Sequence, residues 1–251
     1  MTVRSATLSP ADVEKFPRPD PSTGFITVFV GKKGSGKSFG ARQTFDRYPY
    51  DGVCIDPTRD AKPTCDYELL DEPLPGRFPW SMDSGPRKLL YQPDPRSPRL
   101  VDDIDAAMAL VLNPSDRPCI VWSDEGMAAA SSAHSTGRNH RLFLTQSRHY
   151  GPASGCFCFA RPRRIDPLYL HQADLVFIYR VPSAADRRHL AENMGYPVDR
   201  FEREYSQLVR AAPYSFLLWD NNENVLWQCP PLPSPRSSSS SSTSEPAGSP
   251  A

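Results

Sequence analysis

The chain has 251 residues, 39% of them hydrophobic, which is enough for one large domain with a sizeable core. Its 29 basic and 29 acidic residues cancel to a formal net charge of +0, which argues against a general polyanion binder. No apolar run reaches the ~20 residues that span a bilayer and the N-terminus lacks a signal-peptide core, so we expect no direct membrane insertion. The six cysteines include no C-x-x-C pair and no zinc-like spacing with histidine, which predicts a reduced compartment.

The N-terminal part of the chain leads into one strong motif. Residues 1–23 are polar and proline-bearing, and we expect an arm with a short helix after Ser9. Residues 25–30 are β-branched and aromatic, as a buried strand requires, and residues 39–47 can continue as a helix. Between them the sequence matches the phosphate-binding pattern G-x-x-x-x-G-K-[ST], as Gly31, Lys32, Lys33, Gly34, Ser35, Gly36, Lys37 and Ser38.

Each residue type of this octet suits a nucleoside triphosphate. The three glycines let backbone N–H groups turn toward phosphate oxygens, and the helix start adds a positive dipole end. Lys37 is expected to reach the β- and γ-phosphates, and Ser38 to offer its hydroxyl to Mg²⁺. We therefore predict that residues 31–38, together with Phe39, bind ATP with Mg²⁺.

The middle of the chain alternates strand and helix patterns. Residues 52–57 and 87–92 predict strands, with an irregular proline-rich excursion between them at 57–86. Residues 101–112 carry apolar side chains at helical spacing. Residues 119–122 predict a buried strand that leads into Ser123, Asp124 and Glu125.

The acid pair at the end of that strand predicts hydrolysis. Asp124 is expected to hold the Mg²⁺ coordination shell, directly or through water, and Glu125 to orient and polarise water against the γ-phosphate. A nucleotide switch that only binds needs the first acid but not the second. The pair therefore favours hydrolysis over phosphoryl transfer to a small molecule.

A further strand is predicted at residues 142–145, and it would place Gln146 at the carboxyl end of a parallel sheet. There the amide of Gln146 could sense the γ-phosphate, and Arg148 could neutralise phosphate charge in its own or a neighbouring subunit. The surrounding stretch, 126–165, has no acidic residue and predicts a local positive field. Its arginines are Arg138, Arg141, Arg148, Arg161, Arg163 and Arg164.

The remaining segments complete an α/β pattern. Residues 156–159 alternate as in a buried strand, residues 175–179 predict another strand, and residues 183–194 predict a helix. Residues 214–219 and 225–227 predict a terminal β-hairpin. We therefore expect a mostly parallel sheet with flanking helices and a C-terminal hairpin in one domain at 24–229, followed by a disordered Ser/Pro-rich tail at 230–251.

Missing motifs argue against two nucleotide-binding classes, GTPases and transporter ATPases. There is no N-K-x-D segment for guanine and no L-S-G-G-Q-like segment of transporter ATPases. A small-molecule kinase stays open, because the acid-free stretch at 126–165 could serve as an arginine-rich lid.

In this order, the motifs at 31–38, 53–57, 121–125, 144–148 and 173–180 resemble the HerA/FtsK superfamily of DNA-pumping ATPases. Over residues 24–228 the chain is most similar to the genome-packaging ATPases of tailless, membrane-containing icosahedral viruses. The resemblance implies a RecA-like P-loop core of the ASCE type and a homo-oligomeric ring, commonly a hexamer. It further implies ATP-driven movement of double-stranded DNA into a preformed capsid. The site residues that it implies are Lys37, Ser38, Asp124, Glu125, Gln146 as sensor and Arg148.

The same resemblance implies capsid-vertex or portal proteins as partners, and a location in the host cytoplasm and the virion. Besides the small-molecule kinase, two other functions remain open. One is an assembly ATPase like the zonular-occludens-toxin proteins of filamentous phages, which usually carry a membrane segment after the ATPase core, where this chain has its Ser/Pro tail. The other is a nucleotide-dependent switch without motor activity.

Overall fold

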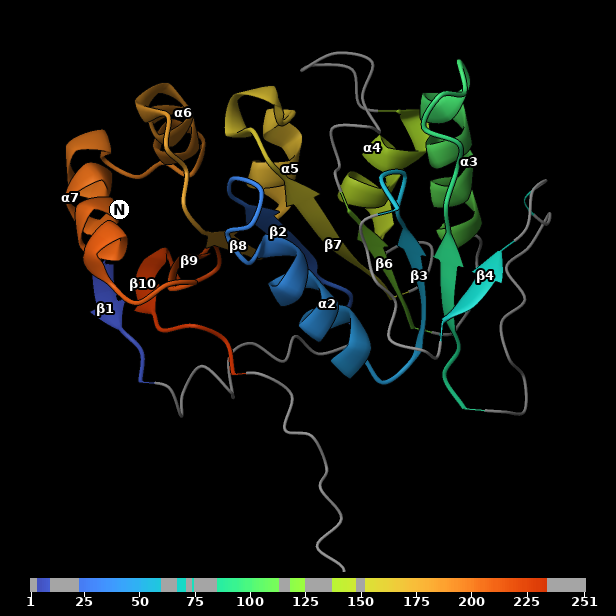
Figure 1. The fold of residues 1–251 in the computed structure, drawn as a ribbon, viewed down its shortest axis with the longest axis horizontal. Coiled ribbons are helices and arrows are strands. Elements are labelled where there is room, and N and C mark those ends of the chain that lie inside the picture. Colours follow the sequence, from blue (N-terminus) through green and yellow to red (C-terminus); the bar gives the residue numbers. More distant parts are fainter. Residues whose placement is uncertain are drawn as a thin grey trace, which may run out of the picture.

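The computed structural model describes residues 4–9, 23–59, 67–70, 74, 85–112, 118–124, 137–147 and 152–233. Within these ranges, ten strands form one twisted sheet in the order β1-β10-β9-β8-β2-β7-β6-β3-β5-β4 (Figure 1). The strands are β1 (Arg4–Thr7), β2 (Ile26–Val30), β3 (Asp51–Ile55), β4 (Glu68–Leu70), β5 (Lys88–Tyr91), β6 (Cys119–Ser123), β7 (Ala153–Phe159), β8 (Leu175–Ile178), β9 (Phe216–Asp220) and β10 (Val225–Cys229).

The sheet is mostly parallel, as the sequence predicts. The seven strands from β8 to β4 in the sheet order run in one direction. Only β9 runs against its neighbours, because β9 and β10 form the expected antiparallel hairpin, in which Val225 is paired with Asp220. β1 adds to the outer side of this hairpin, parallel to β10. This arrangement confirms the predicted α/β fold class.

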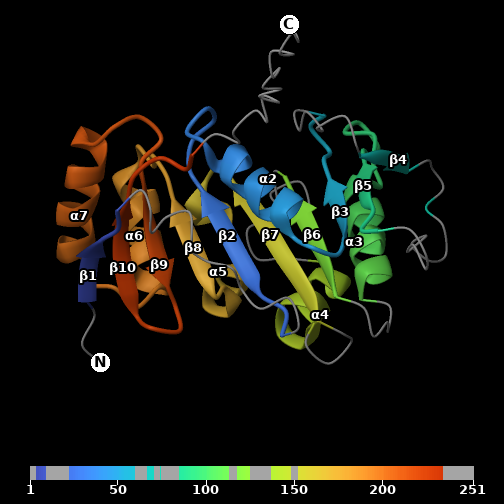
Figure 2. The ribbon, with the colours of Figure 1, turned by 90° about the horizontal axis from the view of Figure 1, so that it is seen from below.

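Helices cover both faces of the sheet unequally. Helix α2 (Lys37–Arg47) lies across one face, over β2, β6 and β7, whereas the other described α-helices cover the opposite face (Figure 2). These helices are α3 (Leu100–Val111), α4 (Arg138–Gln146), α5 (Pro167–Gln172), α6 (Ala184–Asn193) and α7 (Val198–Arg210). A short 3-10 turn at Pro162–Arg164 follows β7.

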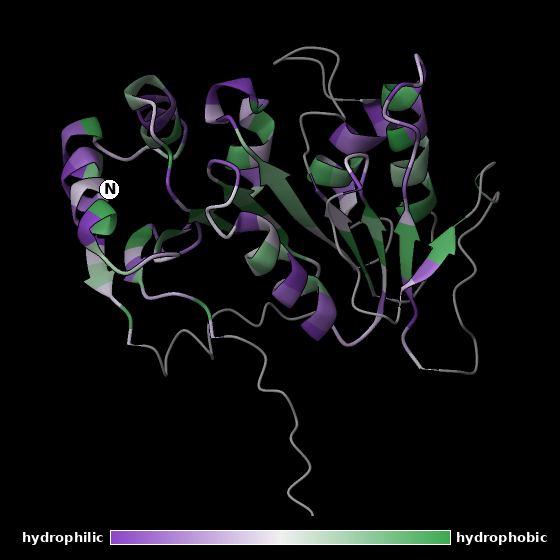
Figure 3. Cartoon of the chain, viewed as in Figure 1, coloured by the Kyte–Doolittle hydropathy of each residue, from purple (hydrophilic) through white to green (hydrophobic). Residues whose placement is uncertain are grey.

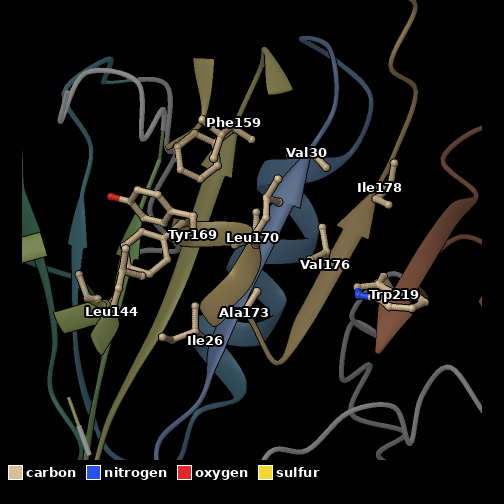
Figure 4. Close-up of a cluster of buried hydrophobic side chains, with 14 of the residues drawn as sticks. Ile26, Val30, Leu144, Phe159, Tyr169, Leu170, Ala173, Val176, Ile178 and Trp219 are labelled. Carbon is tan, nitrogen blue, oxygen red and sulfur yellow. The ribbon is translucent and has the colours of Figure 1, made fainter. Parts of the chain in front are cut away.

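Strand alternation divides the buried side chains into two cores. In β2, Val28 and Val30 belong to the core under α3–α7, whereas Phe29 belongs to the core under α2. Figure 4 shows the larger core, where the ring of Tyr169 on α5 faces Phe159 on β7 with centroids 5.0 Å apart. Fully burying such a side chain stabilises a fold by roughly 1.5–3 kcal/mol. Apolar residues accordingly dominate the central strands, while the outer helices also carry polar residues (Figure 3).

The predicted strand at 142–145 is wrong, because these residues lie in helix α4. The buried positions of this segment are His140, Phe143, Leu144 and Ser147, which is the spacing of a helix face rather than of a strand. Asp105 on α3 also fixes the helix start, since its carboxylate accepts hydrogen bonds from the backbone N–H groups of Asn139 and His140 at 3.0 and 3.1 Å. A short apolar run cannot by itself distinguish the two structures.

Four further elements were not predicted, and one of them is β1, which lies in the expected N-terminal arm. Helix α5 begins with Asp166 as N-cap and a proline at its first position, and α7 begins directly after Pro197. Strand β4 lies inside the stretch that was expected to be irregular. The other predicted strands and helices between residues 25 and 229 are confirmed within one to three residues at their ends. The expected N-terminal helix after Ser9 and the tail from residue 234 lie outside the described residues.

Candidate active site

The glycine-rich loop at residues 31–36 joins β2 to α2 and is fixed by the two strands that flank β2. The Gly31 N–H group donates to the Phe159 carbonyl at the end of β7, at 3.1 Å. The Lys32 N–H group donates to the Arg180 carbonyl beyond β8, at 2.9 Å. The loop therefore lies at the carboxyl edge of the sheet, where parallel strands place binding residues.

Two glycines of the loop cannot carry a side chain. Gly36 caps α2 with φ +104°, and a Cβ there would lie 3.3 Å from the rings of Tyr179 and Tyr214. A Cβ on Gly31 would lie 2.6 Å from Ser35 Oγ and 2.8 Å from Tyr179 Cβ. The buried Ser35 Oγ itself has no hydrogen-bond partner among the described residues. The loop thus forms a cradle of backbone N–H groups with a hydroxyl left to satisfy.

Lys37 opens helix α2 and is only 8% exposed. The first N–H groups of a helix have no intrahelical acceptor, and the helix dipole makes this end positive. Lys37 adds a full positive charge to the same end. The cradle is thus suited to several negative charges, as a triphosphate carries.

The carboxyl end of β6, which leads into an acidic residue, lies next to the start of α2. Asp124 follows β6 and is 5% exposed, and Ser38 Oγ donates a hydrogen bond of 3.1 Å to Asp124 Oδ1. The Asp124 N–H group donates to the Ile55 carbonyl of β3, at 3.1 Å, which fixes the backbone at the strand end. The structure therefore brings together the two residues that the sequence assigns to Mg²⁺.

The surroundings of Asp124 disfavour its charged form. Burial raises the pKa of this carboxyl, and the charge of Asp56 adds to the effect. Lys37 and the hydrogen bonds from Cys158 and Ser38 act in the opposite direction but are outweighed. A cation at this position would reverse the balance, because it stabilises the carboxylate directly.

Asp56 is a site residue that the sequence analysis included only as part of a motif. It lies at the end of β3 and is fully buried, and its carboxylate accepts hydrogen bonds from Thr58 Oγ1 at 3.0 Å and Gln92 Nε2 at 3.1 Å. The signal was present, since an aspartate directly after a buried strand in an α/β pattern lies at the same edge as the phosphate loop.

The predicted place of Gln146 is wrong. It is exposed at the end of α4, seven residues before β7 begins. Because Gly155, near the start of β7, pairs with Ile26 at the start of β2, this helix end lies at the opposite edge of the sheet from the phosphate loop (Figure 2). Gln146 therefore loses the basis for a sensor role.

Ala160 and Arg161 occupy the position that Gln146 was expected to take. They follow β7, which lies between β2 and β6, so they lie at the carboxyl edge of the sheet between the strand that leads into the phosphate loop and the strand that leads into Asp124. Ala160 has no polar side chain, whereas Arg161 is exposed and carries a positive charge. Glu125 and Arg148 lie outside the described residues.

The described residues fit ATP and Mg²⁺. The cradle that a Cβ would fill, the unpartnered Ser35 hydroxyl and the buried Lys37 suit a polyphosphate. The hydroxyl of Ser38 and the carboxylate of Asp124 are oxygen ligands of the kind that Mg²⁺ prefers. Phe39 is 36% exposed one residue further along α2.

Comparison with solved structures gives the same fold. The genome packaging NTPase B204 from Sulfolobus turreted icosahedral virus 2, in complex with ATP-gammaS, matches with a TM-score of 0.64 and 15% identity. This match covers 85% of the present chain and 100% of the other. B204, the DNA-packaging ATPase from Sulfolobus Turreted Icosahedral Virus, matches with a TM-score of 0.62, 14% identity and coverages of 84% and 98%.

A more distant match is the pCW3 conjugation coupling protein TcpA, with a TM-score of 0.50, 14% identity and coverages of 84% and 61%. No protein-family model matches the chain, and no curated protein matches it by sequence. The chain therefore has the fold of these solved structures, and the resemblance drawn from the motifs is confirmed at the level of the fold. Within the described residues no helix is long and apolar enough to cross a membrane.

Proposed function

We propose that this protein is an ATP-hydrolysing translocase that packages double-stranded DNA into a preformed viral capsid. The observation that carries the proposal is the hydrogen bond between Ser38 and Asp124, which joins the phosphate loop to the acidic strand end. The chain that contains this contact shares its fold with structures described as genome-packaging NTPases. A phosphate loop next to a buried acid can bind a nucleoside triphosphate with Mg²⁺, and the second acid of the sequence, Glu125, favours hydrolysis.

The roles of the residues follow from their chemistry. The loop N–H groups and Lys37 bind and orient the phosphates, and Ser38 with Asp124 would hold Mg²⁺, which supplies charge neutralisation when bound. Glu125 takes a proton from the attacking water, because it is the next acid after Asp124 in the sequence. We assign to Arg161 and Arg148 the neutralisation of phosphate charge. Arg161 would act within its own subunit, and Arg148 in its own or a neighbouring subunit.

The proposed DNA contact rests on exposed positive charge. The described arginines of the acid-free stretch are all exposed, and three of them follow β7 at the edge that carries the phosphate loop. Arginines at such positions can contact DNA phosphates without reading sequence. These residues are Arg161, Arg163 and Arg164. We further propose a homo-oligomeric ring, commonly a hexamer, that docks on a capsid vertex or portal.

The test measures ATP hydrolysis by the purified chain with no DNA, single-stranded DNA and long double-stranded DNA. We expect the rate to rise several-fold only with double-stranded DNA. Glu125→Gln is expected to bind ATP normally but to lose about 100-fold or more in turnover, as loss of a general base does. Arg163→Ala with Arg164→Ala serves as the DNA-contact variant. It should keep the basal rate and weaken the stimulation.

Three results would count against the proposal. Stimulation by single-stranded DNA alone would favour an assembly ATPase of the zonular-occludens-toxin kind. Slow hydrolysis that ignores DNA, together with a monomer in solution, would favour a nucleotide switch. Failure of the wild-type chain to bind ATP would exclude any ATP-driven activity, including translocation.

A further inference from the structure

An exposed tyrosine ring lies directly against the phosphate loop. A Cβ on Gly36, the last glycine of the loop, would lie 3.3 Å from Tyr214 Cδ1. Tyr214 is nevertheless 59% exposed and belongs to neither buried core. An aromatic ring that is exposed to solvent and lies next to the start of the helix that follows a phosphate loop is available to a ligand.

The backbone of Tyr214 is in a conformation that tyrosine disfavours. Ala212 and Ser215 close a tight turn, in which the Ser215 N–H group donates to the Ala212 carbonyl at 3.2 Å. Pro213 takes the second position of this turn and Tyr214 the third, with φ +67°. Positive φ at the third position is typical of a type II turn and normally selects glycine. A bulky side chain held there at a steric cost indicates a function for that side chain.

The turn is held at a fixed place beside the loop. It follows α7, whose Val209 carbonyl accepts a hydrogen bond of 3.3 Å from the Arg180 guanidinium. The Arg180 carbonyl in turn accepts from the Lys32 N–H group of the phosphate loop. On the other side, Phe216 begins β9 directly after the turn. Arg180 therefore links the end of α7 to the phosphate loop, and the turn that carries Tyr214 is held between α7 and the sheet.

From this geometry we propose that Tyr214 binds the nucleobase of the nucleotide by stacking. The inference rests on the proposed function and specifies its ligand as a nucleoside triphosphate rather than a bare polyphosphate. With the phosphates in the cradle, the nucleoside end of the molecule must extend away from Asp124. Among the described residues, the exposed Tyr214 lies beside Gly36, and the exposed Phe39 follows Gly36 by three positions on α2. Every base has a π-face, so an aromatic ring can bind it without hydrogen bonds to its edges.

The test compares two ligands, ATP with Mg²⁺ and tripolyphosphate with Mg²⁺, by calorimetric titration. Stacking of one base on an aromatic side chain corresponds to about five- to 150-fold in Kd. We expect Tyr214→Ala to weaken ATP binding by a factor in this range and to leave tripolyphosphate binding unchanged. Tyr214→Phe keeps the ring and should bind ATP like the wild type. Tyr50→Ala is the control, because Tyr50 is 43% exposed at the opposite edge of the sheet, against Tyr48.

A variant that removes the ring and the backbone strain together separates ligand binding from a structural role. Tyr214→Gly should keep or raise the melting temperature, since glycine accepts φ +67° without cost, and should weaken ATP binding as Tyr214→Ala does. Equal weakening of both ligands by Tyr214→Ala, or none, would overturn the inference. So would a changed oligomeric state with unchanged ATP affinity, which would assign the ring to a subunit contact.

The wild-type chain distinguishes the two proposals. If it binds tripolyphosphate as tightly as ATP, the stacking site is refuted while the phosphate loop keeps its role. If it binds neither ligand, the proposed function itself fails, and the stacking site fails with it.

Discussion

Ser38 and Asp124 are 86 residues apart in the sequence, yet the Ser38 hydroxyl donates a hydrogen bond of 3.1 Å to the Asp124 carboxylate. The contact joins the start of α2 to the end of β6, with β7 between β2 and β6. Two ligands of the proposed Mg²⁺ site are therefore held in place by the sheet itself. Little reorganisation is needed when the ion binds, and such preorganisation favours catalysis.

The first prediction is that Asp124→Asn stabilises the nucleotide-free protein while abolishing Mg²⁺-dependent hydrolysis. Burial raises the pKa of Asp124, so the charged carboxylate costs stability as pH rises from the ordinary carboxyl pKa through the raised one. A neutral amide removes that cost. We expect a gain of roughly 0.5–2 kcal/mol in unfolding free energy at pH 7, in the range of stabilising substitutions at functional sites.

Denaturant unfolding at pH 7 and near pH 4 measures this effect. The advantage of Asp124→Asn should shrink toward pH 4, where the wild-type carboxyl takes up its proton. Ser38→Ala is the control, because it removes the hydrogen bond but keeps the buried charge and should not stabilise. A destabilised Asp124→Asn protein at pH 7 would show that the carboxylate is compensated in the fold.

The second prediction concerns Gly40, the fourth residue of α2. Glycine to alanine in a helix interior ordinarily stabilises by about 1 kcal/mol. Here a Cβ would overlap the hydroxyl of the buried Tyr179 and lie 3.1 Å from Phe29 Cε1. Overpacking of this kind costs about 1–3 kcal/mol, so Gly40→Ala should destabilise, with a lower melting temperature.

The double variant Gly40→Ala with Tyr179→Phe tests the cause. The Tyr179 hydroxyl is buried and has no hydrogen-bond partner among the described residues, so its removal alone should cost little. It takes away the main overlap and should restore most of the lost stability. If the phenylalanine gives no rescue, Phe29 or the helix backbone is the limiting contact.

The third prediction concerns the joint between α3 and α4. Asp105 accepts hydrogen bonds from the Asn139 and His140 N–H groups at the start of α4, and from Asn139 Nδ2 at 2.9 Å. Burial alone would raise the pKa of Asp105, but the hydrogen bonds from His140 and Asn139 lower it overall. We expect Asp105→Ala to lose about 1–3 kcal/mol, the cost of leaving such donors unsatisfied.

The acid dependence identifies the charge as the cause. A lowered pKa means that the stabilisation is complete above the ordinary carboxyl pKa of about 3.9 and is lost as pH falls through the folded-state value. The difference between wild type and Asp105→Ala should therefore be constant from pH 7 to 5 and shrink below pH 4. Asp105→Asn keeps one acceptor and should fall between the two proteins. A difference that does not change with pH would mean that packing, not charge, is lost.

The fourth prediction concerns Lys88 at the start of β5. Burial lowers the pKa of this lysine to about 8, although Asp46 and Asp51 oppose the shift. Its ammonium donates to the Tyr48 and Tyr50 carbonyls at 3.0 and 2.8 Å. Between pH 8 and the ordinary lysine pKa the unfolded chain binds more protons, so this group adds stability as pH rises.

The measurement is the unfolding free energy of wild type minus Lys88→Met, at pH 7 and pH 9.5. The difference should move in favour of wild type at the higher pH, with a slope of at most about 1.4 kcal/mol per pH unit for one group. Taking the difference cancels the titration of the buried cysteines, which both proteins share. If this difference in unfolding free energy does not change with pH, the ammonium of Lys88 is in contact with water.

Local sequence patterns predicted most strands of the sheet and, within the site, the phosphate loop and the place of Asp124. The phosphate loop lies between strand and helix as its motif predicts, and Asp124 meets Ser38 because parallel strands end at one edge. The hairpin of β9 and β10 was marked by its polar turn. These features depend on residues that are adjacent in the sequence or on a general property of parallel sheets.

The rest depends on contacts between distant residues. Residues 142–145 are apolar enough for a strand, and only the buried His140 and the carboxylate of Asp105 on another helix fix them as part of α4. Because residues 142–145 were predicted as a strand, Gln146 was wrongly expected at the carboxyl edge of the sheet. Tyr214 was predicted as the first residue of a hairpin strand, whereas the turn at Pro213 places it beside Gly36. No local pattern contains either contact.

The pairing of β1 with β10 has a consequence for biosynthesis. Arg4 is aligned with Val225, so β1 is synthesised roughly 220 residues before the strand that it pairs with. Until β10 has been made, β1 has no strand to pair with, and its backbone N–H and C=O groups remain without their sheet partners. We therefore expect chains released early, before the hairpin is made, to expose this strand and to be preferred substrates for chaperones and proteases.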